Sequence, residues 1–127
     1  MISYGRQHID NNDIKAVVKV LKNNLITQGP SVEKFEKSLS KTFGSKYSCA
    51  LSSGTAALHL LGLALGWKKG DIVFTTPISF LATSNSILYT GAKPEFIDID
   101  KDDYNINVNL LLKKILKFKK EKKQIVA

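Results

Sequence analysis

Residues 71–98 read DIVFTTPISFLATSNSILYTGAKPEFID, and this stretch decides the fold. Its two ends, DIVFT at 71–75 and KPEFID at 93–98, are short and apolar with aromatic and β-branched residues, so they predict strands. Between them, residues 79–89 predict a helix that is closed by Gly91. A strand, a helix and a strand in this order predict parallel strands joined by a right-handed crossover.

The alternation continues on both sides of this unit. Residues 47–51 predict a short apolar strand with Cys49 in the core, and residues 56–65 predict a helix that ends at Gly66. A lysine-rich helix follows the second strand, and residues 124–127 begin a further strand. We therefore expect an α/β fold with a parallel-rich sheet and helices on both of its faces.

Two amphipathic helices are expected before the sheet. The first begins after Asp10 as its N-cap, and the second runs from Pro30 to a stop at Gly44. Their apolar faces are predicted to contain Ile14, Val17, Val18 and Leu21 in the first helix and Phe35, Leu39 and Phe43, as buried residues, in the second. We therefore divide the chain into an N-terminal helical segment, residues 1–44, and the start of an α/β domain, residues 45–127.

The chain ends on IVA, in the middle of a predicted strand. A parallel sheet that stops there leaves an unpaired apolar edge, which complete proteins usually avoid. We therefore expect these 127 residues to be the N-terminal part of a longer chain.

The composition is that of an ordinary water-soluble protein, with 43% hydrophobic and 24% charged residues. No apolar run approaches the roughly 18 residues of a membrane span. The opening MISYGRQHID has no apolar signal core, so a cytoplasmic location is expected. A single cysteine excludes an internal disulfide and any multi-cysteine metal site.

The net charge of +8 comes mainly from the segment LLLKKILKFKKEKK at residues 110–123. Its apolar residues recur at helical spacing, namely Leu111, Leu112, Ile115, Leu116 and Phe118. We interpret the segment as an amphipathic helix whose lysines form a solvated face. Binding to nucleic acid or to an anionic surface is the alternative. Since no aromatic or arginine-rich surface accompanies the charge, we expect neither a nucleic-acid nor a membrane partner.

Two loops are expected at the carboxyl ends of parallel strands, where such sheets bind ligands. The first is SSGT at 52–55, whose N–H groups at a helix start can bind an anion. The sequence contains neither GxxxxGK[ST] nor GxGxxG, so a nucleotide loop is not supported. The local sequence is equally consistent with an ordinary helix cap at Ser53 or Thr55. Both interpretations stay open.

The second loop is TTPISF at residues 75–80, in which Ser79 is a possible helix cap. An aromatic ring at Phe80 can lie flat against a planar cofactor, although the local sequence favours a core position. Before the sheet, Tyr4 and the segment NLITQG at 24–29 are most simply connecting residues.

Four segments together resemble the DegT-type sugar aminotransferases, a family of pyridoxal-phosphate (PLP) enzymes with the aspartate-aminotransferase-like fold, fold type I. The segments are LITQGPSVEKFE at 25–36, SSGTAAL at 52–58, TPISFLAT at 76–83 and GAKPEFID at 91–98. Within the family, TPISF and TQG are most similar to the branch that serves pseudaminic acid biosynthesis. The resemblance implies transfer of an amino group, from glutamate, to a UDP-linked 4-keto-6-deoxy sugar.

The resemblance also assigns roles to residues. It implies that Ser53, Gly54 and Thr55 hold the phosphate of PLP and that Phe80 stacks on its pyridine ring. Residues implied to line the nucleotide-sugar pocket are Tyr4, Asn24, Leu25, Ile26 and Thr27. A homodimer is implied because both subunits of such enzymes build each active site.

No catalytic residue is expected within the chain. The family's Schiff-base lysine and the carboxylate that pairs with the pyridine nitrogen would lie beyond Ala127, so the chain alone is expected to be inactive. Two alternatives remain open: a non-catalytic module that binds phosphate or a nucleotide sugar, and a dehydratase relative in which histidine replaces the lysine.

Overall fold

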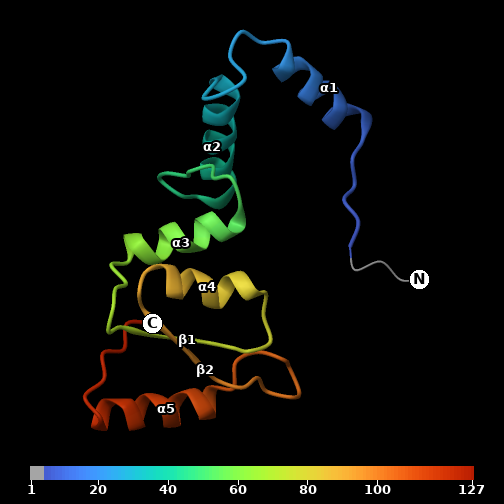
Figure 1. Cartoon of the computed structure of the whole chain (residues 1–127). Helices are drawn as coiled ribbons and strands as arrows, with labels where there is room; N and C mark the ends of the chain where they lie inside the picture. The colour runs from blue at the N-terminus through green and yellow to red at the C-terminus, as the bar shows by residue number, and fades with distance from the viewer. Residues whose placement is uncertain (1–4) are drawn as a thin grey trace. The chain divides into compact units, whose positions relative to one another are not determined.

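The computed structural model of this chain describes residues 5–127, which form two compact units. The first unit ends at Ala50 and contains α1 (Asn11–Leu21) and α2 (Pro30–Phe43). The second unit, Leu51–Ala127, contains in chain order α3 (Gly54–Ala64), β1 (Ile72–Thr75), α4 (Leu81–Tyr89), β2 (Lys93–Phe96) and α5 (Val108–Lys120) (Figure 1).

The predicted ends of the first two helices are confirmed. The Asp10 carboxylate accepts the N–H groups of Asn12 and Asp13, and the Asp13 carboxylate accepts the N–H of Asp10, which makes a reciprocal capping box. Helix α2 begins at Pro30 and ends before Gly44, whose φ of 65° is in the left-handed region that glycine adopts readily.

The predicted burial of the α2 face is wrong. Phe35 is 55% exposed and Phe43 is 77% exposed, and neither α1 nor α2 contains a buried residue. The physical reason is that α1 and α2 make no extensive contact with each other within the described first unit. Their apolar faces therefore have no partner in that unit.

The predicted strand at residues 47–51 is also absent from the described structure. A strand needs a neighbouring strand to pair its backbone, but here the N–H of Ala50 donates to the Glu36 carboxylate at 2.8 Å. The Ser48 hydroxyl is hydrogen-bonded to that of Ser40 at 2.9 Å, so the segment is tied to α2 by side chains. Cys49, expected in the core, is exposed for the same reason.

The predicted parallel sheet is present in the second unit. β1 pairs in parallel with β2, with Ile72 opposite Lys93 and Thr75 opposite Phe96. On the other side of β1, residues 124–127 begin a third parallel segment: the Ile72 N–H donates to the Gln124 carbonyl, and the Phe74 N–H donates to that of Ala127, both at 2.8 Å. β1 is therefore the central strand.

Helices cover both faces of this sheet, as expected. α4 packs on β1 and β2 and also against α3, whereas α5 lies on the opposite side of the sheet (Figure 1). Val73, Ile87 and Ala92 form the buried core between the sheet and α4, with Trp67 packed against it. On the α5 side, the Phe118 ring stacks on Phe74 with 5.9 Å between ring centroids. No helix among the described residues is long and apolar enough to cross a bilayer.

Candidate functional site

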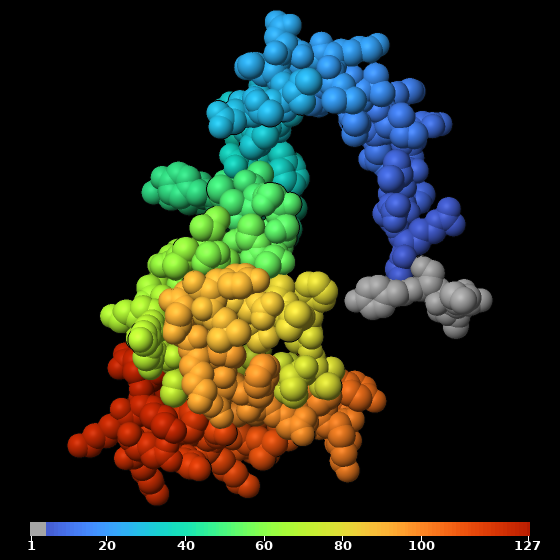
Figure 2. All heavy atoms as spheres, in the orientation of Figure 1, coloured from blue at the N-terminus to red at the C-terminus, as the bar shows by residue number. Residues whose placement is uncertain are grey.

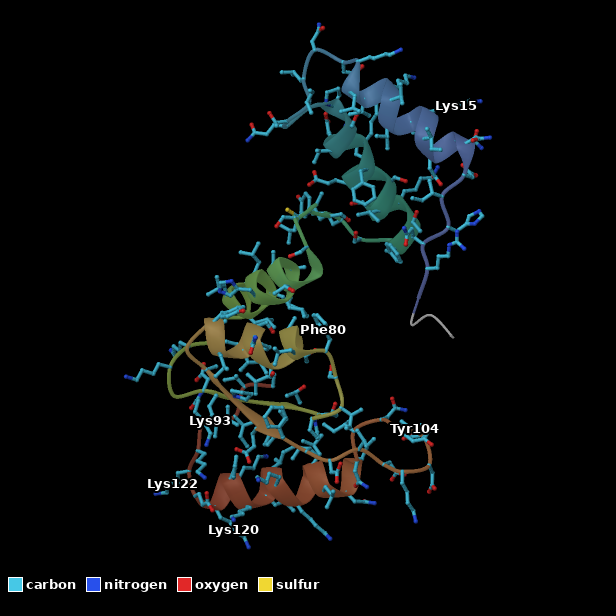
Figure 3. All side chains as sticks on the ribbon, turned by 45° about the vertical axis from the view of Figure 1, so that its right-hand side comes forward. Lys15, Phe80, Lys93, Tyr104, Lys120 and Lys122 are labelled. Carbon is cyan, nitrogen blue, oxygen red and sulfur yellow. The ribbon has the colours of Figure 1, made fainter. Side chains whose placement is uncertain are left out.

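The starts of α3 and α4 lie at one edge of the second unit. The two helices pack against each other and run in the same direction, and their N-termini lie at the end of the sheet where β1 stops (Figure 1). The SSGT loop leads into α3, and Phe80 directly precedes α4 at that end (Figure 3). The structure therefore brings together the two loops that the sequence singled out.

Ser53 is the N-cap of α3, as one of the two interpretations expected. Its Oγ accepts the N–H of Ala56 at 3.1 Å, and its carbonyl accepts the N–H of Ala57 at 3.1 Å. The N–H groups of Gly54 and Thr55, however, have no acceptor among residues 5–127. Because these N–H groups stand at the positive end of the helix dipole, the cap and an anion site are compatible.

The space above this loop is open. A Cβ placed on Gly54 would meet nothing within 4 Å, so the backbone can be approached closely by a ligand. The Ser53 hydroxyl is exposed, and its hydrogen is still available to an anion because the bond from Ala56 uses only an oxygen lone pair. Thr55 adds a second hydroxyl at the first turn. The residue set fits a phosphate group.

Phe80 is not a core residue. Its side chain is 77% exposed, so the local-sequence preference for a core position is wrong and the ring is free to contact a ligand. Ser79 is not the cap of α4: the helix begins at Leu81, and Phe80 occupies the N-cap position without a capping side chain. The Ser79 hydroxyl pairs instead with that of Thr83 at 2.9 Å.

Thr83 is a polar residue of this edge that the sequence analysis missed. Its hydroxyl, in the first turn of α4, pairs with that of Ser79, the residue before the N-cap Phe80. The spacing of four residues between Ser79 and Thr83 is a signal that could have found it, because residues i and i+4 are neighbours on a helical surface.

The residues expected to contact a nucleotide sugar precede the second unit in the chain. Tyr4 is outside the described residues, and Asn24 to Thr27 form the exposed connection between α1 and α2 in the first unit. Leu25 and Ile26 are 59% and 66% exposed, so their side chains are accessible to a ligand.

Among the described residues, the titratable groups with displaced pKa values belong neither to the SSGT loop nor to residues 75–80. Hydrogen bonds from Lys37 and from Lys123 lower the pKa of Glu33 and of Glu121, respectively, and the backbone N–H of Asn105 lowers the pKa of Asp103. Among residues 5–127, no group of three His, Cys, Asp or Glu side chains could hold a metal ion. The edge is thus equipped to bind and orient an anionic, planar group.

A sequence model of the DegT/DnrJ/EryC1/StrS aminotransferase family matches residues 7–127. The chain belongs to this family. It is 48% identical over 117 residues to the curated UDP-4-amino-4,6-dideoxy-N-acetyl-beta-L-altrosamine transaminase of Campylobacter jejuni. That match covers 92% of this chain but only 31% of the relative, so the chain spans less than a third of that protein's length.

Solved structures of similar proteins confirm the fold class. Spr1654 from Streptococcus pneumoniae, in its PLP form, superposes with a TM-score of 0.82 and 30% identity over 88% of this chain and 29% of its own. A GDP-4-keto-6-deoxymannose-3-dehydratase with a trapped PLP-glutamate geminal diamine superposes with a TM-score of 0.78 and 32% identity, over 85% of this chain and 30% of its own. The chain therefore has the α/β fold type I expected from its sequence.

Proposed function

We propose that this chain forms the N-terminal, cofactor-binding part of a PLP-dependent aminotransferase that acts on a nucleotide-linked 4-keto-6-deoxy sugar. The Campylobacter relative named as an altrosamine transaminase and the PLP form of Spr1654 support this assignment. The observation that carries it is the edge where the free N–H groups of Gly54 and Thr55 and the exposed ring of Phe80 face a common end of the sheet.

In this proposal the SSGT loop holds the phosphate of PLP. The N–H groups of Gly54 and Thr55 donate to the phosphate oxygens, and the hydroxyls of Ser53 and Thr55 add further donors. The bare Cα of Gly54 lets the phosphate approach the backbone, since the structure shows open space there. The dipole of α3 stabilises the negative charge at the same point.

Phe80 holds the ring of the cofactor. An exposed aromatic side chain on the same edge as a phosphate site can stack on the pyridine and exclude water from one of its faces. When bound, PLP supplies an electron sink that allows an amino group to be moved between an amino acid and a keto sugar. The role of the described residues is to orient that group, and we assign no lysine of this chain as its covalent anchor.

We propose that residues of the first unit contact the substrate. Tyr4 and Asn24 to Thr27 are proposed to line the nucleotide-sugar pocket, with glutamate as amino donor and a pseudaminic acid precursor or a related amino sugar as product. A homodimer is proposed because both subunits build each active site in the enzymes that this chain resembles. The proposed location is the cytoplasm, in keeping with the composition. The 127 residues alone are expected to be inactive.

The phosphate site is tested with Thr55→Val in the protein expressed from its complete reading frame. Loss of one hydrogen bond to a charged group should weaken PLP binding by about tenfold to a hundredfold. Thr42→Val, at an exposed position in α2, is the matched control and should leave binding unchanged. PLP affinity is measured from the cofactor absorbance. Equal affinity in the two variants would show that Thr55 does not bind the phosphate of PLP.

The reaction itself is tested with glutamate and a UDP-linked 4-keto-6-deoxy sugar. Formation of the amino sugar together with 2-oxoglutarate supports the aminotransferase. The similarity to the 3-dehydratase favours one second candidate, a dehydratase, which would instead release a deoxygenated keto sugar. Binding of PLP without either product would indicate the non-catalytic module.

A further inference from the structure

Helix α5 has an inner and an outer face. On the inner face, Phe118 is 4% exposed, and Ile115 is half-buried. On the outer face, Val108, Leu112 and Leu116 are 70%, 55% and 53% exposed. Because these three residues are four apart, they form one aliphatic stripe along the helix. The assignment of Leu112 and Leu116 to the same apolar face as Phe118 is therefore wrong, since only the inner side of α5 meets the sheet.

The lysines of this segment fall into two sets. Three of them take part in ion pairs: Lys114 pairs with Glu95 at 2.6 Å, and Lys117 and Lys123 share Glu121 at 4.0 and 2.5 Å. The other four form no ion pair with any residue of the described part of the chain, namely Lys113, Lys119, Lys120 and Lys122. These uncompensated charges accompany the aliphatic stripe.

Helical geometry places the free lysines directly beside the stripe. At 100° per residue, Lys119 falls within the stripe near its C-terminal end, and Lys113 and Lys120 lie together along one side of it, next to Leu116. A shallow hollow of about 430 Å³ has Leu116 in its wall and is bordered by Lys113, Lys117, Lys120 and Glu121. The surface of α5 forms the outer border of the second unit in Figure 2, and Lys120 and Lys122 are labelled at its C-terminal end in Figure 3.

We propose that the outer face of α5 docks on an anionic lipid bilayer. Val108, Leu112 and Leu116 enter the headgroup region, and the free lysines contact lipid phosphates while their aliphatic stems lie along the apolar stripe. Four free lysines match the size of the basic clusters that bind anionic lipid. This inference departs from the expectation of a merely solvated lysine face, and it does not depend on the proposed enzymatic activity.

A bilayer is favoured over nucleic acid by the chemistry of the face. Exposed aliphatic side chains gain nothing from a phosphate backbone in water, whereas they gain free energy on entering lipid. The outer face of α5 contains no arginine and no aromatic side chain for base recognition. The ammonium group of lysine is a point charge on a flexible side chain, so it can follow lipid headgroups that move laterally.

The test is co-sedimentation of the protein, expressed from its complete reading frame, with vesicles. We expect binding to phosphatidylcholine vesicles that contain phosphatidylglycerol, little binding to pure phosphatidylcholine, and weakening as salt is raised. The triple variant Lys113→Gln, Lys119→Gln, Lys120→Gln should lose roughly a hundredfold in vesicle affinity. The matched control, Lys68→Gln, Lys69→Gln, Lys101→Gln, changes three exposed loop lysines of the second unit that lie outside its helices, so it changes net charge equally and should keep its affinity.

A second variant separates lipid insertion from simple charge attraction. Leu112→Ser with Leu116→Ser keeps the charge and should lower vesicle affinity by at least tenfold while leaving far-UV circular dichroism unchanged. Unaltered vesicle binding by this variant would overturn the proposal, as would equal binding by the two lysine variants. Duplex DNA that binds as tightly as the vesicles, regardless of the leucine changes, would reassign the face to nucleic acid. Because the lysine variant changes only exposed, unpaired side chains, it tests the proposal even if the leucine variant unfolds.

Discussion

Gly62 of α3 lies directly against the indole of Trp67. A Cβ built on Gly62 would be 2.8 Å from Trp67 Cε3 and 2.9 Å from Thr90 Cγ2, and the backbone N–H of Trp67 donates to the Gly62 carbonyl at 3.0 Å. Gly62 is also the only buried residue of α3. This contact sets how closely α3 approaches α4, and hence how the SSGT loop and Phe80 come to the same edge.

Gly62→Ala should therefore destabilise the fold. The added methyl group would overlap both the Trp67 ring and the Thr90 methyl, and overpacking of this kind costs about 1–3 kcal/mol. Urea unfolding measures the change in the free energy of unfolding. An unchanged midpoint would show that α3 and α4 are not held at the spacing seen in the structure.

Gly54→Ala should leave the stability of the fold intact and weaken PLP binding. Nothing lies within 4 Å of the new methyl group, so folding should be unaffected or stabilised by up to about 1 kcal/mol, because alanine is the better helix former. PLP affinity should nevertheless fall by at least tenfold, since the methyl group would occupy the space proposed for the phosphate. If cofactor affinity, followed by absorbance titration, matches the wild type, Gly54 does not adjoin a bound phosphate.

Phe80→Ala should affect cofactor binding and not stability. The side chain is 77% exposed, so the free energy of unfolding should change by less than about 0.5 kcal/mol. Loss of the stacked ring should weaken PLP binding roughly threefold to tenfold and shift its absorbance band. Phe43→Ala is the matched control, because Phe43 is equally exposed but lies in the first unit. Identical spectra for both variants would contradict stacking by Phe80.

The ion pair between Glu95 and Lys114 should contribute to the docking of α5 on the sheet. Its atoms are 2.6 Å apart, and the two side chains are only 17% and 34% exposed. A double-mutant cycle with Glu95→Gln and Lys114→Met should give a coupling energy of about 1 kcal/mol in urea unfolding. The pair of Lys93 and Glu95, at 4.0 Å with Lys93 74% exposed, is the internal control and should show almost no coupling. Equal coupling in both pairs would show that burial of the pair has no effect.

The pKa of Glu33 should lie below its usual value of 4.5, because Lys37 donates a hydrogen bond to its carboxylate at 2.6 Å and adds a favourable charge. Since the pKa is lowered in the folded state, the small stabilisation it provides is present above pH 4.5 and is lost as the pH falls through the folded-state pKa. Carboxyl-carbon NMR should show the pKa return toward 4.5 in Lys37→Gln but not in Lys34→Gln. If the pKa of Glu33 is the same in Lys37→Gln as in the unchanged protein, the pairing is disproved.

Patterns that depend on neighbours in the chain were predicted well. The Asp10 cap, the helix from Pro30 to Gly44 and the strand around Val73 all follow from short-range geometry: side-chain capping, fixed backbone angles and alternation of strands with helices. The SSGT loop was found in the same way, as the start of a helix after an apolar stretch.

Predictions that required a partner surface were less successful. Residues 47–51 have the composition of a strand but lack a neighbouring strand among the described residues, so their backbone bonds to Glu36. Phe35 and Leu116 are apolar at helical spacing, yet both are exposed, because periodicity identifies a face without identifying what covers it.

The sequence by itself determined the order of the elements, their caps and the two loops with ligand-binding chemistry, because these depend on interactions between residues a few positions apart. Only the tertiary structure decided that Phe80 is exposed and that, among residues 5–127, the N–H groups of Gly54 and Thr55 lack acceptors and four lysines of residues 110–123 lack counter-ions. Burial and ion pairing depend on which distant segments meet, and that is settled by packing such as the approach of Gly62 to Trp67.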